Sequence, residues 1–210
     1  MARIVWKEGK FISIETRKGL YVLAQMTLNI YLVVYNNFRF DENWEESDLS
    51  NLEILCCVPV TRQFIQKSTI TNLKFKKEVP LNLPKYWLIS DHISNKRIIF
   101  ENTKNEIEVL LLGLGENLIY DDIKDRSNFD RPIVQKVAFN DNDIIDKYEV
   151  TNIRIYAEFN ERLYLCYKIG KNVDPLKDLI FNRDIPIEYE VYMKIISGKI
   201  TEEEWLALPI

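Results

Sequence analysis

Apolar residues in the first third of the chain fall into closely spaced runs whose length and alternation are typical of β-strands. Residues 10–16 alternate weakly between apolar and polar positions. The runs 20–26 and 30–36 are apolar on both faces, and a further run covers 53–60. Strands that are apolar on both faces belong to a small barrel or to the middle of a covered sheet. The pattern over residues 3–76 therefore predicts an SH3-like or otherwise strongly bent small β-barrel.

More strands are expected in the middle of the chain. Two prolines in residues 77–96 predict an irregular crossing. Residues 97–100 and 107–112 flank a polar loop and predict a hairpin. A second and clearer hairpin is expected where residues 153–159 alternate, an Asn-Glu pair makes a turn, and the run 163–169 follows.

Helix signals gather at the C-terminal end. Asp174-Pro175 is a good N-cap and N1 pair, and Pro186 opens a second helical pattern that Gly198 ends. Thr201 is followed by three glutamates, which is the capping-box pattern of a third helix. Helices are therefore expected within residues 174–208.

These elements predict an α+β fold with a strand-rich body and helices gathered at the C-terminus. We expect a single compact domain over 1–210, made of an N-terminal β module at 3–76, a second β region at 97–170 and the helices at 174–208. No linker-like segment longer than the 77–96 crossing interrupts the chain.

Composition narrows the class of protein. Apolar residues make up 47% of the 210, so the chain can bury a sizeable core. Its formal charge of -4 makes nucleic acid an unlikely partner, because proteins that bind phosphate backbones are usually basic. The N-terminus lacks the apolar core of a secretory signal, no window is long enough to span a bilayer, and three cysteines make no disulfide framework. A cytoplasmic protein with buried reduced thiols is expected.

The residues offer little for catalysis. The single histidine, His92, lies beside Asp91 in a polar segment, where a solvated loop position is expected. Gly113 and Gly115 lack the third glycine of a dinucleotide fingerprint and the Lys-Ser/Thr of a P-loop, so a strand-ending turn is expected. We therefore predict no enzyme, no cofactor and no metal site.

Acidic residues form several clusters along the chain. A solvated face is the ordinary interpretation of such clusters, and an acidic docking surface for a basic partner is the alternative. Trp44 stands beside one cluster and is a candidate anchor, because buried aromatics carry much of the binding energy of an interface. The candidate partner-binding residues are Trp44, Glu45, Glu46, Asp48, Asp121, Asp122 and Asp125. Two further clusters lie at residues 141–146 and 202–204.

The N-terminal block resembles a known family. A glycine opens the strand Gly9–Ile14, a tight turn leads to the Gly-aromatic pair of Gly19–Met26, and a further strand covers Tyr31–Phe38. This pattern, over roughly residues 6–64, is similar to the immunity protein 26 family of bacterial polymorphic toxin systems. The chain departs from it at Gln25, where family members often have a glycine-arginine step.

The resemblance implies a small cytosolic protein that binds a cognate toxin, often a nuclease or another enzyme, and neutralises it by occlusion. Immunity of this kind needs no catalytic residue and no cofactor. The alternative is a cytosolic small-barrel module that binds a ligand or a nucleic acid, supported by the Phe and Tyr content and by the basic, aromatic-interleaved stretch Lys74-Phe75-Lys76-Lys77. An enzyme that uses His92 or the carboxylates is a third hypothesis.

Overall fold

The computed structural model describes residues 4–76, 79–81, 83–90, 93–115, 117–125 and 131–209. These residues form a mixed fold of antiparallel sheets and helices, which confirms the α+β class. The chain divides into two compact units. The first comprises residues 1–83, 153–173 and 209–210, and the second comprises 84–152 and 174–208. The single domain expected from the sequence stays a prediction.

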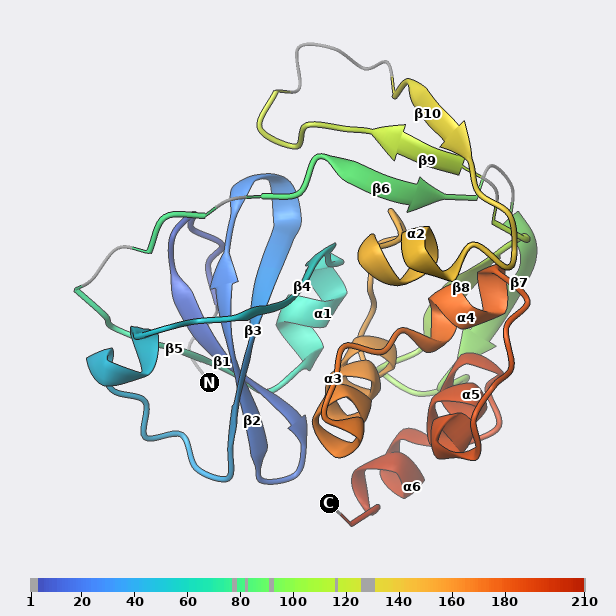
Figure 1. The fold of residues 1–210 in the computed structure, drawn as a ribbon. Coiled ribbons are helices and arrows are strands. Elements are labelled where there is room, and N and C mark those ends of the chain that lie inside the picture. Colours follow the sequence, from blue (N-terminus) through green and yellow to red (C-terminus); the bar gives the residue numbers. More distant parts are fainter. Residues whose placement is uncertain are drawn as a thin grey trace. The chain divides into compact units, whose positions relative to one another are not determined.

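The first unit is built on a five-stranded antiparallel sheet with strand order β4-β3-β2-β1-β5 (Figure 1). The first four strands are those expected from the sequence: β2 has the expected bounds, and those of β1, β3 and β4 differ by one to three residues. Short turns join β1, β2 and β3 into a meander, as the closely spaced apolar runs predict. The bounds are β1 Phe11–Arg17, β2 Leu20–Met26, β3 Tyr31–Arg39, β4 Ile54–Pro59 and β5 Ile70–Asn72.

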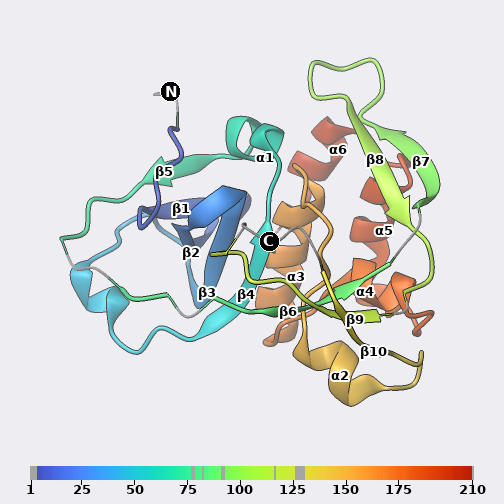
Figure 2. The same ribbon diagram turned by 90° about the horizontal axis from the view of Figure 1, so that it is seen from above.

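Successive residues of β1 to β4 are mostly buried, so side chains on both faces of this sheet lie in the core, as the two-sided apolar runs predict. Helices α1 (Arg62–Lys67) and α3 (Glu158–Ile169) lie on one side of it (Figure 2). The ring of Phe64 on α1 packs 5.3 Å from that of Phe159 on α3, and both side chains are fully buried. Among the described strands the sheet stays open between β4 and β5, so no closed barrel is found.

Helix α3 corrects the clearest hairpin expected from the sequence. Residues 158–169 form one continuous helix in place of a turn and a strand, and Gly170 ends it at φ +76°. The second β region expected over 97–170 therefore stops at Lys136, the end of β10. The alternation misled because the polar residues between the apolar ones, Arg154 and Glu158 among them, are themselves buried, and so is Glu161 of the expected turn. A polar position here does not mark a solvent-facing side.

Ion pairs and hydrogen bonds make that burial possible. The Arg17 guanidinium lies 2.6 Å from the Glu161 carboxylate, and its Cζ is 3.9 Å from the centre of the Tyr164 ring. Arg154 pairs with Glu158 at 3.2 Å, with both side chains almost completely buried. The backbone of Arg154 also bonds that of the chain after β4, accepting from the Thr61 N–H at 2.9 Å. The segment 153–173 is thereby fixed to the N-terminal sheet.

The second unit contains two small sheets and most of the helices. One sheet has the order β10-β9-β6 and the other is the hairpin β7-β8. The hairpin confirms the expectation around residues 97–112, whereas β6 and the start of β7 stand inside the crossing expected to be irregular. The strands are β6 Tyr86–Ile89, β7 Ile93–Ile99, β8 Ile107–Leu112, β9 Asn117–Tyr120 and β10 Ile133–Lys136.

The helical C-terminal region is confirmed. Pro175 is the first residue of α4, and the Thr201 hydroxyl accepts from the Glu204 N–H in the expected capping box. Helix α2 is not predicted from the sequence, which indicates only an acidic cluster at residues 141–146. The helices of this unit are α2 Asn142–Lys147, α4 Pro175–Ile180, η3 Ile187–Tyr189, α5 Glu190–Ile196 and α6 Glu202–Leu206.

We expect the variant Arg17→Met to lower the free energy of unfolding by about 3–5 kcal/mol, because it leaves the buried Glu161 carboxylate without its arginine. Urea unfolding measures the loss. The matched control Lys194→Met breaks an exposed pair with Glu190 and should cost less than about 1 kcal/mol. Equal losses in the two variants would contradict a special role for the buried pair.

Candidate binding surface

The segment 40–53, which joins β3 to β4, carries the first group of candidate residues and is called the Trp44 loop here. Its only helical piece among these described residues is the short turn η2 (Glu46–Leu49). The Asp41 carboxylate accepts the Asn43 N–H at 2.8 Å, and the Asp48 carboxylate accepts the Glu45 N–H at 2.7 Å. Side chains that accept from nearby backbone N–H groups hold turns of this kind in one conformation. The loop is therefore ordered by its own acidic residues.

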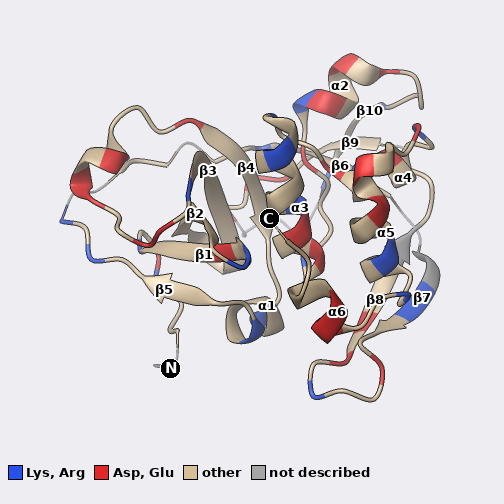
Figure 3. Ribbon diagram, turned by 90° about the horizontal axis from the view of Figure 1, so that it is seen from below, with Lys and Arg blue, Asp and Glu red and all other residues tan. Residues whose placement is uncertain are grey.

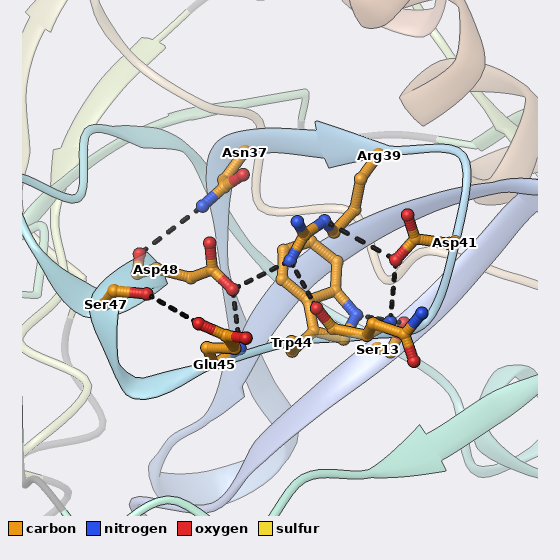
Figure 4. Close-up of polar contacts among 9 residues, drawn as sticks. Ser13, Asn37, Arg39, Asp41, Trp44, Glu45, Ser47 and Asp48 are labelled. Carbon is orange, nitrogen blue, oxygen red and sulfur yellow. Dashed lines mark hydrogen bonds and ion pairs between the residues drawn. The ribbon is translucent and has the colours of Figure 1, made fainter.

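Arg39 and Trp44 join the loop to the sheet (Figure 4). The Arg39 guanidinium, at the end of β3, lies 2.8 Å from the Asp48 carboxylate and donates to the Asn43 carbonyl at 2.6 Å. Its Cζ is 5.0 Å from the centre of the Trp44 ring. The Trp44 indole N–H donates to the Ser13 hydroxyl on β1 at 2.9 Å. Trp44 therefore ties the loop to the sheet, and its role as an anchor for a partner stays a prediction.

The negative charge of the chain is concentrated in this loop. Residues 39–53 hold six carboxylates against a single arginine, whereas the whole chain carries a net charge of only -4. Figure 3 shows these acidic positions in red. Glu42, Glu45 and Glu46 are exposed. A surface with one sign of charge attracts a partner of the opposite sign and raises the rate of encounter.

Contacts with the strand β5 region hold the exposed acids in place. The Thr71 hydroxyl donates to the Glu42 carboxylate at 2.9 Å, and the Lys76 backbone N–H donates to the Glu46 carboxylate at 2.8 Å. Each carboxylate oxygen accepts more than one hydrogen bond, so these acids can still accept from lysine or arginine. An ordered acidic loop loses less conformational entropy on binding than a mobile one.

Three aromatic side chains meet at the start of this loop, and none of them is among the candidates that the sequence indicates. The Tyr167 ring, on α3, lies 5.5 Å from that of Phe38 and 5.8 Å from that of Phe40. Phe40 is 60% exposed and Tyr167 is 38% exposed. We call these three residues the aromatic cluster. Tyr167 reaches the end of β3 because residues 158–169 form the helix α3 and pack against the N-terminal sheet. No local signal in the sequence indicates that contact.

The second group of candidate residues lies in the other unit and is largely compensated. Asp121 is buried and lies 3.0 Å from Arg131. Asp122 lies 2.7 Å from Lys85, whose hydrogen bond lowers the pKa of the Asp122 carboxyl. Asp125 is exposed and its N–H donates to the Asp122 carbonyl. Opposite charges therefore compensate Asp121 and Asp122, whereas the six carboxylates of the Trp44 loop share the single arginine Arg39.

The two remaining acidic clusters, at 141–146 and 202–204, contain residues with structural partners. Asp146 pairs with Arg183 at 2.6 Å, and Glu204 completes the cap of α6. Over the described ranges no three His, Cys, Asp or Glu side chains are grouped as ligands for a metal ion. A metal site needs several such oxygen, nitrogen or sulfur donors close enough together to bind one ion.

The structure gives less support to a functional role for the other residues that the sequence singles out. His92, Asp91 and Lys77 lie outside the described residues. In the basic stretch, the Phe75 ring packs edge-on against Phe11 at 5.4 Å, where it serves the core rather than a stacked base. The turn after β8 is confirmed, since the Gly115 N–H donates to the Ile180 carbonyl at 2.7 Å instead of facing a ligand.

All three cysteines are described, and all three are buried, as the sequence predicts. None of the helices in the described part of the chain has the length and apolar character needed to cross a bilayer.

A family model matches residues 1–185, and its description reads "Domain of unknown function (DUF8309)". The chain belongs to this family. Both the Trp44 loop and the aromatic cluster lie inside the DUF8309 match, whereas α5 and α6 lie beyond it. No curated protein and no solved structure matches the chain.

We expect Asp48→Asn to loosen the Trp44 loop and to lower the free energy of unfolding by about 1 kcal/mol, because the amide loses the charge that holds Arg39. Urea unfolding and hydrogen exchange at the Glu45 amide measure the two effects. The control Glu53→Gln removes the same charge from the loop, but its carboxylate accepts only a long 3.4 Å bond from Asn36. Faster exchange at Glu45 in both variants would show that charge alone, and not the Asp48 contacts, orders the loop.

Proposed function

We propose that this chain is an immunity protein, which binds a cognate bacterial toxin and neutralises it by occlusion. The observation that carries the proposal is the ordered Trp44 loop, which concentrates the negative charge of the chain beside exposed aromatic rings. The likeness of residues 6–64 to the immunity protein 26 family supports the same function. The proposed site of action is the cytoplasm, and the partner is a toxin, which the family resemblance suggests is a nuclease or another enzyme.

The negative charge of the Trp44 loop favours a partner with a basic surface. Enzymes that act on nucleic acids carry lysine and arginine where they bind phosphates. An acidic loop that covers such a surface takes the place of the phosphates and blocks the substrate. The exposed Glu42, Glu45 and Glu46 are suited to pair with those cations.

The aromatic cluster supplies the apolar part of the proposed interface. Exposed Phe40 and Tyr167 can enter pockets of the partner, where aromatic side chains contribute strongly to affinity. Charged pairs around them then set the orientation and the rate of association. This function requires no catalytic residue, no cofactor and no metal of the chain itself.

We also propose that the first unit follows an SH3-like path. The strand order β4-β3-β2-β1-β5 and the short helix between β4 and β5 support this assignment. Register shifts in the β2-β3 and β3-β4 pairs support the strong bending that such a path needs. In this arrangement the Trp44 loop is the connection between the third and fourth strands.

Co-expression with the product of the gene immediately upstream tests the function. We expect the wild-type chain to restore growth and to co-purify with that product as a stable one-to-one complex. The double variant Glu45→Lys/Glu46→Lys should weaken the complex at least tenfold and slow its association, because two attractive charges become repulsive.

The control Asp184→Lys/Glu188→Lys makes the same change of charge at two exposed positions of the other unit and should leave affinity unchanged. Thermal melts confirm that both variants are folded. Unchanged affinity in the loop variant would overturn the acidic-loop interface, and the absence of both rescue and complex with the wild type would overturn immunity itself.

A further inference from the structure

A separate cavity of about 400 Å³ opens on the first unit, away from the residues of the Trp44 loop. It lies between the N-terminal segment, the turn η1 (Leu28–Ile30) and the start of α1. Six of the nine side chains that line it are apolar, including Trp6, Ile30 and Ile65. Sites for small molecules have this size and this mainly apolar lining with a few polar groups. We call it the Trp6 cavity.

Hydrogen bonds fix the walls of the Trp6 cavity. The Trp6 indole N–H donates to the Thr27 carbonyl at 2.9 Å, which holds the N-terminal segment against the turn that follows β2. The Val60 N–H donates to the Ile30 carbonyl at 3.0 Å, and the Thr61 hydroxyl caps α1 by accepting the Phe64 N–H at 3.1 Å. The cavity is therefore formed before any ligand enters it.

Ile30 holds an unusual conformation at this cavity. Its φ is +70°, in the left-handed region, which is unfavourable for a β-branched residue. Its side chain is nevertheless 44% exposed, so complete burial in the core does not offset the strain. Residues held in strained conformations gather at ligand sites, where the surrounding structure maintains them. An apolar ligand that covers Ile30 would remove this surface from water.

The positive charge of Arg62 in the cavity lining favours a ligand with a negatively charged group. Arg62 is the only charged side chain in its lining, it is exposed, and no carboxylate of the described residues pairs with it. An arginine guanidinium presents a fork of N–H donors that matches a carboxylate. Thr61 and Gln66 offer further polar atoms in the lining.

We propose that the Trp6 cavity binds a small amphipathic carboxylate, with its apolar body against Trp6, Ile30 and Ile65 and its carboxylate at Arg62. This site does not depend on toxin binding. The class includes medium-chain fatty acids, and octanoate is the probe for the test. Octan-1-ol is the matched neutral probe, because it has the same chain length without the charge.

Isothermal titration calorimetry and Trp6 fluorescence on the full chain test the site. We expect octanoate to bind saturably and more tightly than octan-1-ol. Arg62→Met should weaken octanoate about tenfold and leave octan-1-ol unchanged, because it removes the guanidinium but keeps an apolar side chain. The variant Trp6→Phe should abolish the fluorescence change, which assigns the signal among the four tryptophans.

A second variant tests the apolar wall without straining the fold. Ile30→Gly suits a positive φ, so the backbone is retained, and it should weaken both probes by a similar factor. The proposal would be overturned if neither probe binds saturably. It would also be overturned if both bind equally and Arg62→Met changes neither, since the cavity would then recognise no carboxylate.

Discussion

The first unit depends on the burial of charged side chains at the start of α3. Arg17 and Glu161, and Arg154 and Glu158, form ion pairs that lie almost wholly out of contact with solvent. Removing one member of such a pair leaves a buried charge without that partner, which proteins tolerate poorly. These ion pairs help to hold residues 153–173, which are distant in the sequence, against the N-terminal sheet. That packing completes the core and brings Tyr167 to the end of β3.

The proposed interface follows from the same arrangement. Phe38 and Phe40, at and just after the end of β3, contact the Tyr167 ring. Between them, Arg39 lies against Trp44 of the following loop. Acidic residues order the loop by accepting backbone N–H groups, yet most of them remain exposed. Exposed aromatic side chains and a concentrated charge thus stand side by side in the first unit, and the proposed interface uses both.

Much of the fold could be predicted from the sequence, because local signals agree with the final structure. The two-sided apolar runs mark β1–β4, and Asp174-Pro175 and Thr201 mark real helix starts. The hairpin expected at 153–169 was wrong because buried ion pairs, not solvent, surround its polar residues. The aromatic cluster and the Trp6 cavity combine residues distant in the sequence, so no local pattern could place them. Trp44 could be predicted to lie beside acidic residues because they are its neighbours in the chain, and its role in binding stays a proposal.

Hydrogen exchange of the chain, alone and in complex with the upstream gene's product, tests the central claim most directly. A binding face loses exchange at the amides that the partner covers or stiffens. The account predicts protection concentrated in residues 38–49 and at the end of α3, with little change at 117–125. Protection centred on 117–125, with the Trp44 loop exchanging as in the free chain, would contradict it.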